Sequence, residues 1–261
     1  MRRVADSLAG EANGHVAFSP GMFQRCRQLI SAASSAFQGP QMSGFSTARL
    51  KMVDGQVRTS DVTDRNVLDA MLAVPREAFV PAAKQALAYL DLDLDVSEGG
   101  AKRFLIKPQL TGKLLQAAEI GEGDNVLVVG CATGYLAALM AKLAKQVTAT
   151  ECDSALAAKA KDACASLGLA NVTCKAASCS EGDSSAAPYD VIILNGATEV
   201  TPEGLLGQLR EGGRLVGVSA ESRPPRAMIV THTHGEFGHR ALFDAAAPVL
   251  PGLERAAAFV F

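Results

Sequence analysis

The sequence predicts an α/β protein in which a mostly parallel, doubly wound sheet forms the middle of three layers. A short apolar run at 126–129 stops at a glycine, and apolar residues at helical spacing follow it. Further apolar runs alternate with helical segments, which is the pattern of parallel strands joined by crossover helices. Two last runs flank a glycine-containing turn and predict an antiparallel hairpin at the sheet edge. The predicted strands are 126–129, 146–150, 171–175, 189–194, 214–219, 227–233 and 239–244, and the helices between them are 136–143, 155–167 and 202–209.

Composition limits the class of protein. The 261 residues are 48% hydrophobic, enough for one core and a smaller subdomain. The net charge of −2 argues against general nucleic-acid affinity, and no apolar run reaches membrane-spanning length. The six cysteines form no Cys-x-x-Cys pair, so we expect free thiols in a reducing compartment and a cytoplasmic protein.

The first 51 residues differ from the rest. They are rich in Ser, Ala, Gly and Arg, and their only acids are Asp6 and Glu11. A short amphipathic helix at 23–37 is the one regular element they suggest. We expect 1–51 to be a weakly ordered extension; a disordered tail, an Arg-rich targeting segment and translation upstream of a start at Met42 or Met52 remain open.

Residues 52–118 predict a helical cap region. Apolar residues at 67–74 repeat at helical spacing after the cap candidates Ser60, Asp61 and Thr63, and Pro75 ends that helix. The alternation at 89–95 places Asp91, Asp93 and Asp95 on one face if it is extended, where a solvated face is favoured over a metal site. A further helix begins near Pro108.

The turn after the first strand predicts a ligand site. Gly130, Ala132 and Gly134 are small residues at alternating positions, which lets backbone approach a ligand and a helix pack on the strand. The next strand ends in Glu151, about 20 residues later, where a carboxylate can hold both ribose hydroxyls of an adenosine ligand. The alternative is that Glu151 is a solvated residue at a strand end.

A second cluster of ligand-type residues surrounds the predicted hairpin. His232, His234 and His239 flank its turn, and His-x-His on a strand places two imidazoles on one face. Zinc needs a third or fourth ligand, so an exposed polar hairpin is favoured and no metal is predicted.

These stretches together resemble a known family. The turn, the acidic strand end, the Gly-Gly before a strand and the final hairpin are similar to S-adenosylmethionine-dependent methyltransferases. In detail the chain resembles protein-L-isoaspartate O-methyltransferases from about Met52 to Leu253. The stretches that carry the likeness are 75–81 (Pro-Arg-Glu-Ala-Phe-Val-Pro), 88–91, 126–135, 189–193 and 209–213. The resemblance implies a Rossmann-like methyltransferase fold, with 119–261 binding S-adenosylmethionine and 52–118 carrying the active-site loop.

The cofactor positions that the resemblance implies are Gly130, Cys131, Ala132, Gly134, Tyr135, Glu151, Cys152, Ser178 and Asn195. Several positions depart from the family pattern. Val128 replaces an acid, Ser178 replaces an aspartate, and Ala132 replaces a glycine, which is tolerable if its φ is negative. The Gly-Tyr-Gly before the active-site loop is replaced by residues 98–100.

The loop at 104–108, Phe-Leu-Ile-Lys-Pro, departs most, because Ile106 stands where the family has its active-site serine. The catalytic residue is therefore not assigned; Lys107 is the candidate, either holding an acceptor carboxylate or extending to water. A carboxylate with a pKa of about 4 is ionised at neutral pH and needs no general base. Losing one orienting hydrogen bond costs about 1–3 kcal/mol, which does not exclude activity.

The resemblance thus implies methylation of a protein or peptide carboxylate, isoaspartyl in protein repair, by a monomer or homodimer without nucleic-acid or membrane partners. Two alternatives remain: a methyltransferase with a different acceptor, and a non-catalytic binding or scaffold protein.

Overall fold

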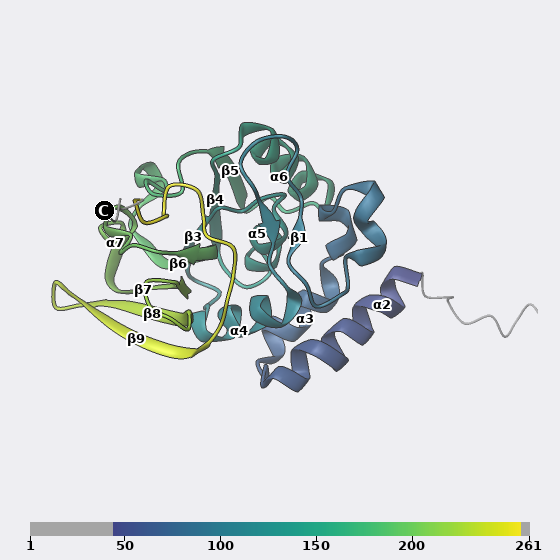
Figure 1. Cartoon of the computed structure of the whole chain (residues 1–261), viewed down its shortest axis with the longest axis horizontal. Coiled ribbons are helices and arrows are strands. Elements are labelled where there is room, and N and C mark those ends of the chain that lie inside the picture. The colour runs from purple at the N-terminus through teal and green to yellow at the C-terminus, as the bar shows by residue number, and fades with distance from the viewer. Residues whose placement is uncertain (1–43, 257–261) are drawn as a thin grey trace, which may run out of the picture. The chain divides into compact units, whose positions relative to one another are not determined.

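The computed structural model describes residues 44–256 and builds them around a seven-stranded sheet in the order β5-β4-β3-β6-β7-β8-β9 (Figure 1). Neighbours from β5 to β7 are parallel, and β8 and β9 join antiparallel. The predicted fold class is therefore confirmed.

The strands are β3 (Asn125–Val129), β4 (Gln146–Glu151), β5 (Val172–Ala176), β6 (Tyr189–Thr198), β7 (Leu209–Ser219), β8 (Arg226–Thr233) and β9 (Glu236–Asp244). The helices among them are α4 (Pro108–Ala118), α5 (Tyr135–Met140), α6 (Ser154–Ser166) and α7 (Glu203–Leu206).

The three layers follow from strand alternation. In β3, Val126 and Val128 join the core that includes apolar residues of α4, α5 and α6. Leu127 and Val129 point to the other core, which α7 and the C-terminal residues Leu250 and Leu253 complete. All four β3 side chains are fully buried, as expected for a parallel strand covered on both faces.

The cap region precedes the sheet and contains α2 (Gly44–Met52), α3 (Arg65–Ala73) and a two-stranded ribbon of β1 (Leu94–Asp95) and β2 (Phe104–Leu105). The cap of α3 is Asp64, whose Oδ1 accepts from the amides of Asn66 and Val67, at 2.8 and 3.3 Å. The candidates Ser60, Asp61 and Thr63 were therefore wrong, since they lie before the residue that the helix uses.

The predicted aspartate alternation also has a different role. Only Leu94–Asp95 is extended, and Asp93 Oδ1 accepts from the Lys107 amide at 2.8 Å. Asp91 Oδ1 accepts from the Gln109 amide at 3.2 Å. Both carboxylates thus satisfy free amides at the N-terminus of α4. Among residues 44–256 there is no group of three or more His, Cys, Asp or Glu placed to hold a metal, including the three hairpin histidines.

Helix α2 lies before the domain boundary that the sequence placed at Met52. Its Arg49 donates to Tyr89 Oη at 3.0 Å, to the Leu72 carbonyl at 3.1 Å and to Glu77 Oε1 at 3.2 Å. Within the described residues, the cap region therefore includes α2 from Gly44 onward. The predicted helix at 23–37 and most of the predicted extension lie outside the described residues.

Near the C-terminus, the ends of several elements differ from the predicted ones. The helix predicted at 202–209 is only α7, and β7 begins at Leu209. The hairpin turn is reduced to His234 and Gly235, with φ of 55° and 77°, so β9 starts inside the predicted turn. Within the described part of the chain, no helix is long and apolar enough to cross a membrane.

Candidate active site

The turn after β3 lies at the carboxyl edge of the sheet, where the chain order reverses between β3's neighbours β4 and β6. Gly130, Ala132 and Gly134 have φ of 68°, 50° and 96°. The condition under which alanine would be tolerated without strain, a negative φ, is not met at Ala132: a left-handed alanine costs about 1–2 kcal/mol, so surrounding contacts hold the turn. At Gly134 a β-carbon would lie 3.0 Å from that of Ala160, so glycine lets α6 pack against the turn.

Glu151 ends β4 and faces this turn. Its side chain is 0% exposed, so it is not the solvated residue of the alternative interpretation. Its Oε2 accepts from the Ala132 amide at 2.6 Å, and its Oε1 accepts from Cys152 Sγ at 3.2 Å. The acid at the strand end and the small-residue turn are therefore in direct contact, and their binding of a ligand stays a prediction.

Arg103, which was not among the predicted site residues, occupies this site. Its Nε donates to Glu151 Oε1 at 2.8 Å and its Nη2 to Oε2 at 3.1 Å. The same Nη2 donates to the Gly130 carbonyl at 2.7 Å, and Arg103 is 1% exposed. Burial opposes the charge, but the hydrogen bonds and attraction of Glu151 outweigh it and raise the pKa of Arg103.

An adenosyl ligand does not fit this arrangement while Arg103 stays in place. The carboxylate expected to hold ribose hydroxyls already binds the guanidinium. Space beside the turn is filled too, since a β-carbon on Gly130 would lie 2.6 Å from Arg103 Nη2 and 2.6 Å from Leu250 Cδ2. Residues 130–132 are fully buried, so they offer no amide to a ligand from solvent.

Asn195 and Ser178 lie on either side of this centre. Asn195 Nδ2, at the switch between β3 and β6, donates to the Gly130 carbonyl at 2.8 Å and to the Phe104 carbonyl at 3.3 Å. It thereby joins the turn to the predicted active-site loop. Ser178 instead hydrogen-bonds Ser180, Oγ to Oγ at 2.8 Å, and lines a cavity of about 470 Å³ with Cys152.

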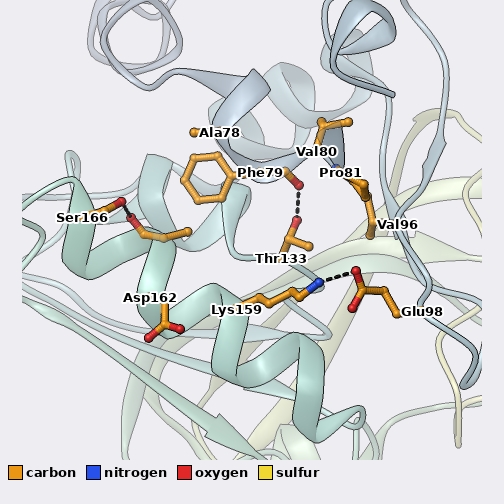
Figure 2. Close-up of a pocket in the computed structure, with 11 residues that line it drawn as sticks. Ala78, Phe79, Val80, Pro81, Val96, Glu98, Thr133, Lys159, Asp162 and Ser166 are labelled. Atoms are coloured by element: carbon orange, nitrogen blue, oxygen red, sulfur yellow. Dashed lines mark hydrogen bonds and ion pairs between the residues drawn. The ribbon is translucent and has the colours of Figure 1, made fainter. Parts of the chain in front are cut away.

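A second cavity, of about 380 Å³, opens between α6 and the segment 78–81 (Figure 2). Figure 2 shows Thr133 donating to the Phe79 carbonyl, at 2.6 Å, and Lys159 paired with Glu98 across it. Neither cavity is lined by Gly130, Ala132 or Glu151. The two cavities therefore do not provide the cofactor cleft that the sequence predicted around these residues.

The loop residues divide between core and surface. Ile106 is 2% exposed, and its carbonyl accepts from Arg76 Nη2 at 2.9 Å. Its side chain belongs to the core that the cap region shares with one face of the sheet. Lys107 is half-buried, and its ammonium forms no ion pair with any side chain that the structure describes.

Tyr135 and the cysteines lie near the site, and the Tyr135 hydroxyl is buried without a hydrogen-bond partner among the described residues. The Tyr135 ring packs edge-on against Phe79, at 5.6 Å between centroids, under the Arg76 guanidinium. Cys131 is fully buried, and Cys152 is a free thiol. Burial raises the pKa of the Cys131 and Cys152 thiols, with Glu151 adding to it, and raises the pKa of Cys179 to about 12.

The sequence did contain a signal for Arg103. A carboxylate predicted at the end of a buried strand needs a partner, because an unpaired buried charge is costly. Arg103 directly precedes the loop already assigned to the site. It was therefore one of three candidate cations there, with Lys102 and Lys107.

Comparison with known proteins identifies the family. Residues 48–237 match the model of the protein-L-isoaspartate (D-aspartate) O-methyltransferase family. A protein-L-isoaspartate O-methyltransferase of Koribacter versatilis is 40% identical over 177 residues, covering 68% of this chain and 78% of that protein. One from Rhodopseudomonas palustris is 36% identical over 206 residues, covering 77% and 83%.

Solved structures agree with this. A protein-L-isoaspartate O-methyltransferase superposes with a TM-score of 0.70 at 25% identity, covering 79% of this chain and 67% of that chain. A Plasmodium falciparum structure with S-adenosyl-L-homocysteine bound has a TM-score of 0.67 at 18% identity, covering 80% and 99%, which supports the fold. The family uses S-adenosylmethionine. The chain belongs to the protein-L-isoaspartate (D-aspartate) O-methyltransferase family.

Proposed function

We propose that the chain is an S-adenosylmethionine-dependent carboxyl O-methyltransferase that acts on isoaspartyl residues of proteins or peptides. One observation carries the proposal besides family membership. Glu151, the acid expected to hold the cofactor ribose, lies at the end of β4 and accepts the Ala132 amide of the adjacent turn. This contact supports the proposal, because an acid at the end of the second strand beside the turn after the first is where such a fold can hold a ribose.

The chain's own residues have a limited task on the acceptor side. An isoaspartyl carboxylate is ionised at neutral pH, so binding and orientation suffice and no proton has to be removed. Arg76 and Asp93 hold the backbone of Ile106 and Lys107, through the Ile106 carbonyl and the Lys107 amide. The Lys107 ammonium beside the N-terminus of α4 then offers a positive region to the acceptor carboxylate.

Methanol release tests this function, because carboxyl methyl esters hydrolyse to methanol. The full chain is incubated with S-adenosylmethionine and an isoaspartyl peptide, and the same peptide with normal aspartate is the control. We expect methanol from the isoaspartyl peptide alone, and less from Lys107→Gln, mainly through a higher KM for the peptide. Equal release from both peptides would assign a different acceptor.

A second candidate function rests on the Arg103 contact. Glu151 is already engaged in a buried ion pair. The site as it stands is therefore compatible with a protein that binds partners and does not bind the cofactor. Calorimetry with S-adenosylhomocysteine separates the candidates. Absence of binding heat in the wild type and in a folded Arg103→Ala variant favours the non-catalytic protein.

A further inference from the structure

The loop 97–103 contacts the carboxyl ends of β3 and β4 and the start of α6 at three places. The Glu98 carboxylate pairs with Lys159 of α6, as Figure 2 shows. The backbone at Gly100 passes Asp153, the N-cap of α6, so closely that a β-carbon would lie 2.6 Å from Asp153 Oδ2. Arg103 then reaches Glu151 and the Gly130 carbonyl.

These contacts leave Glu151 without capacity for another ligand. Its Oε1 accepts from Arg103 Nε, from Cys152 Sγ and from the Asp153 amide at 3.3 Å. Its Oε2 accepts from Arg103 Nη2 and the Ala132 amide. An ionised carboxylate has about four lone-pair sites, so ribose hydroxyls bind only if a present donor leaves. The Arg103 guanidinium is the donor that can leave, because it belongs to the loop 97–103, whereas the Ala132 amide belongs to the turn itself.

We propose that loop 97–103 is an internal occupant of the cofactor cleft and that the Arg103 guanidinium competes with the adenosyl ligand for Glu151. This inference rests on the proposed function, which identifies Glu151 as the acid for that ligand. A ligand that binds only the open form has an apparent Kd equal to its intrinsic Kd divided by the fraction of molecules that are open. The buried two-point ion pair makes that fraction small.

The outer contact is weaker than the inner one. The Lys159 and Glu98 side chains are 48% and 39% exposed, whereas those of Arg103 and Glu151 are 1% and 0% exposed. An exposed pair contributes little because water and salt screen it. Arg103 is thus the main barrier to the ligand, and Glu98 adds a small one at the other end of the loop.

Isothermal titration calorimetry with S-adenosylhomocysteine on the full chain tests the proposal. We expect Arg103→Ala to bind at least about tenfold more tightly than the wild type, because the competing cation is gone. Lys102→Ala is the matched control: it removes a cation from the same loop, but Lys102 is exposed and pairs with Asp95. Its affinity should equal that of the wild type.

Glu98→Gln keeps the test decisive if Arg103→Ala does not fold. It loosens the exposed end of the loop and leaves Glu151 paired, so we expect an affinity increase of up to about fivefold. In that case, equal affinity of Glu98→Gln and the wild type overturns the proposal.

The remaining outcomes separate this inference from the proposed function. If the wild type and Arg103→Ala bind with the same high affinity, the loop does not compete and the inference fails, while the cofactor-dependent function stands. If both are folded and neither binds, Arg103 is not the barrier, and the inference and the cofactor-dependent function fail together.

Discussion

Arg103 and Glu151 form a two-point ion pair, 2.8 Å between Nε and Oε1, in which both side chains are shielded from water. The two residues come from the cap region and from the end of β4, so the pair fastens the predicted active-site loop to the sheet. Removing one partner of such a pair leaves an uncompensated buried charge. The pair therefore makes the stability of the chain depend on both residues together.

A double-mutant cycle measures that dependence. We expect Arg103→Met and Glu151→Leu each to lower the free energy of unfolding by about 3–5 kcal/mol, because each leaves the other charge buried. The double variant should lose much less, since two apolar side chains replace the pair. Urea denaturation at pH 7 is the measurement. Additive losses would contradict an interaction between these groups.

Ala132→Gly should raise stability slightly. The alanine has a φ of 50°, and relief of its left-handed strain by about 1–2 kcal/mol is partly offset by the greater freedom of glycine in the unfolded chain, about 0.5–1 kcal/mol. The expected net gain is up to about 1 kcal/mol, seen as a higher urea midpoint. Ala138→Gly, inside α5, is the control and should destabilise instead. A loss in Ala132→Gly equal to that control would rule out the strain.

Ile106→Ser introduces the residue type that the resemblance to the family implies at this position, but it should weaken the fold. Ile106 is 2% exposed in the core that the cap region shares with the sheet, so truncation leaves a cavity and buries a hydroxyl. We expect a loss of about 3–5 kcal/mol, against about 1 kcal/mol for the control Ile106→Val. Chemical denaturation compares the two. A serine variant as stable as the valine variant would show that the side chain can leave the core.

Asp183 should contribute to stability in a pH-dependent way. Burial opposes its charge, but Lys175 Nζ at 2.6 Å and the hydroxyl and amide of Ser185 outweigh it and lower the pKa of Asp183. The stabilisation is thus present above the unfolded pKa, about 4, and is lost as the pH falls through the lower folded value.

Asp183→Asn tests that contribution and retains the cap to Ser185. At pH 7 we expect a loss of about 0.5–1 kcal/mol, because Lys175 is partly exposed and its pairing is screened. Below the folded pKa the variant and the wild type should have the same stability. Urea midpoints across the acidic range provide the comparison, and a difference independent of pH would exclude the carboxylate as its source.

The sheet was predictable because its strands are marked by local signals. The apolar run of β3 ends at Gly130, and the run of β4 ends at Glu151, so both boundaries were close to the structure. The starts of β7 and β9 were not, since the pairing of Leu209 with Tyr189 and of Glu236 with Thr233 extends both strands beyond local propensity. Residues 44–51 were assigned to the extension because Arg49 acts only through contacts distant in sequence.

The site was predictable only in part. Glu151 and the turn follow from spacing along one stretch of chain, and the structure brings them together. Arg103 meets Glu151 across 48 residues, a contact that neither spacing nor periodicity reveals. The sign of φ at Ala132 likewise depends on contacts made by the folded turn.

The sulfur atoms around the ion pair have a consequence for how the protein withstands oxidants. Thiolates react with peroxide and disulfides, whereas protonated thiols are slow to do so. Because the pKa values of Cys131, Cys152 and Cys179 are all raised, these three thiols stay protonated at neutral pH and react slowly with oxidants.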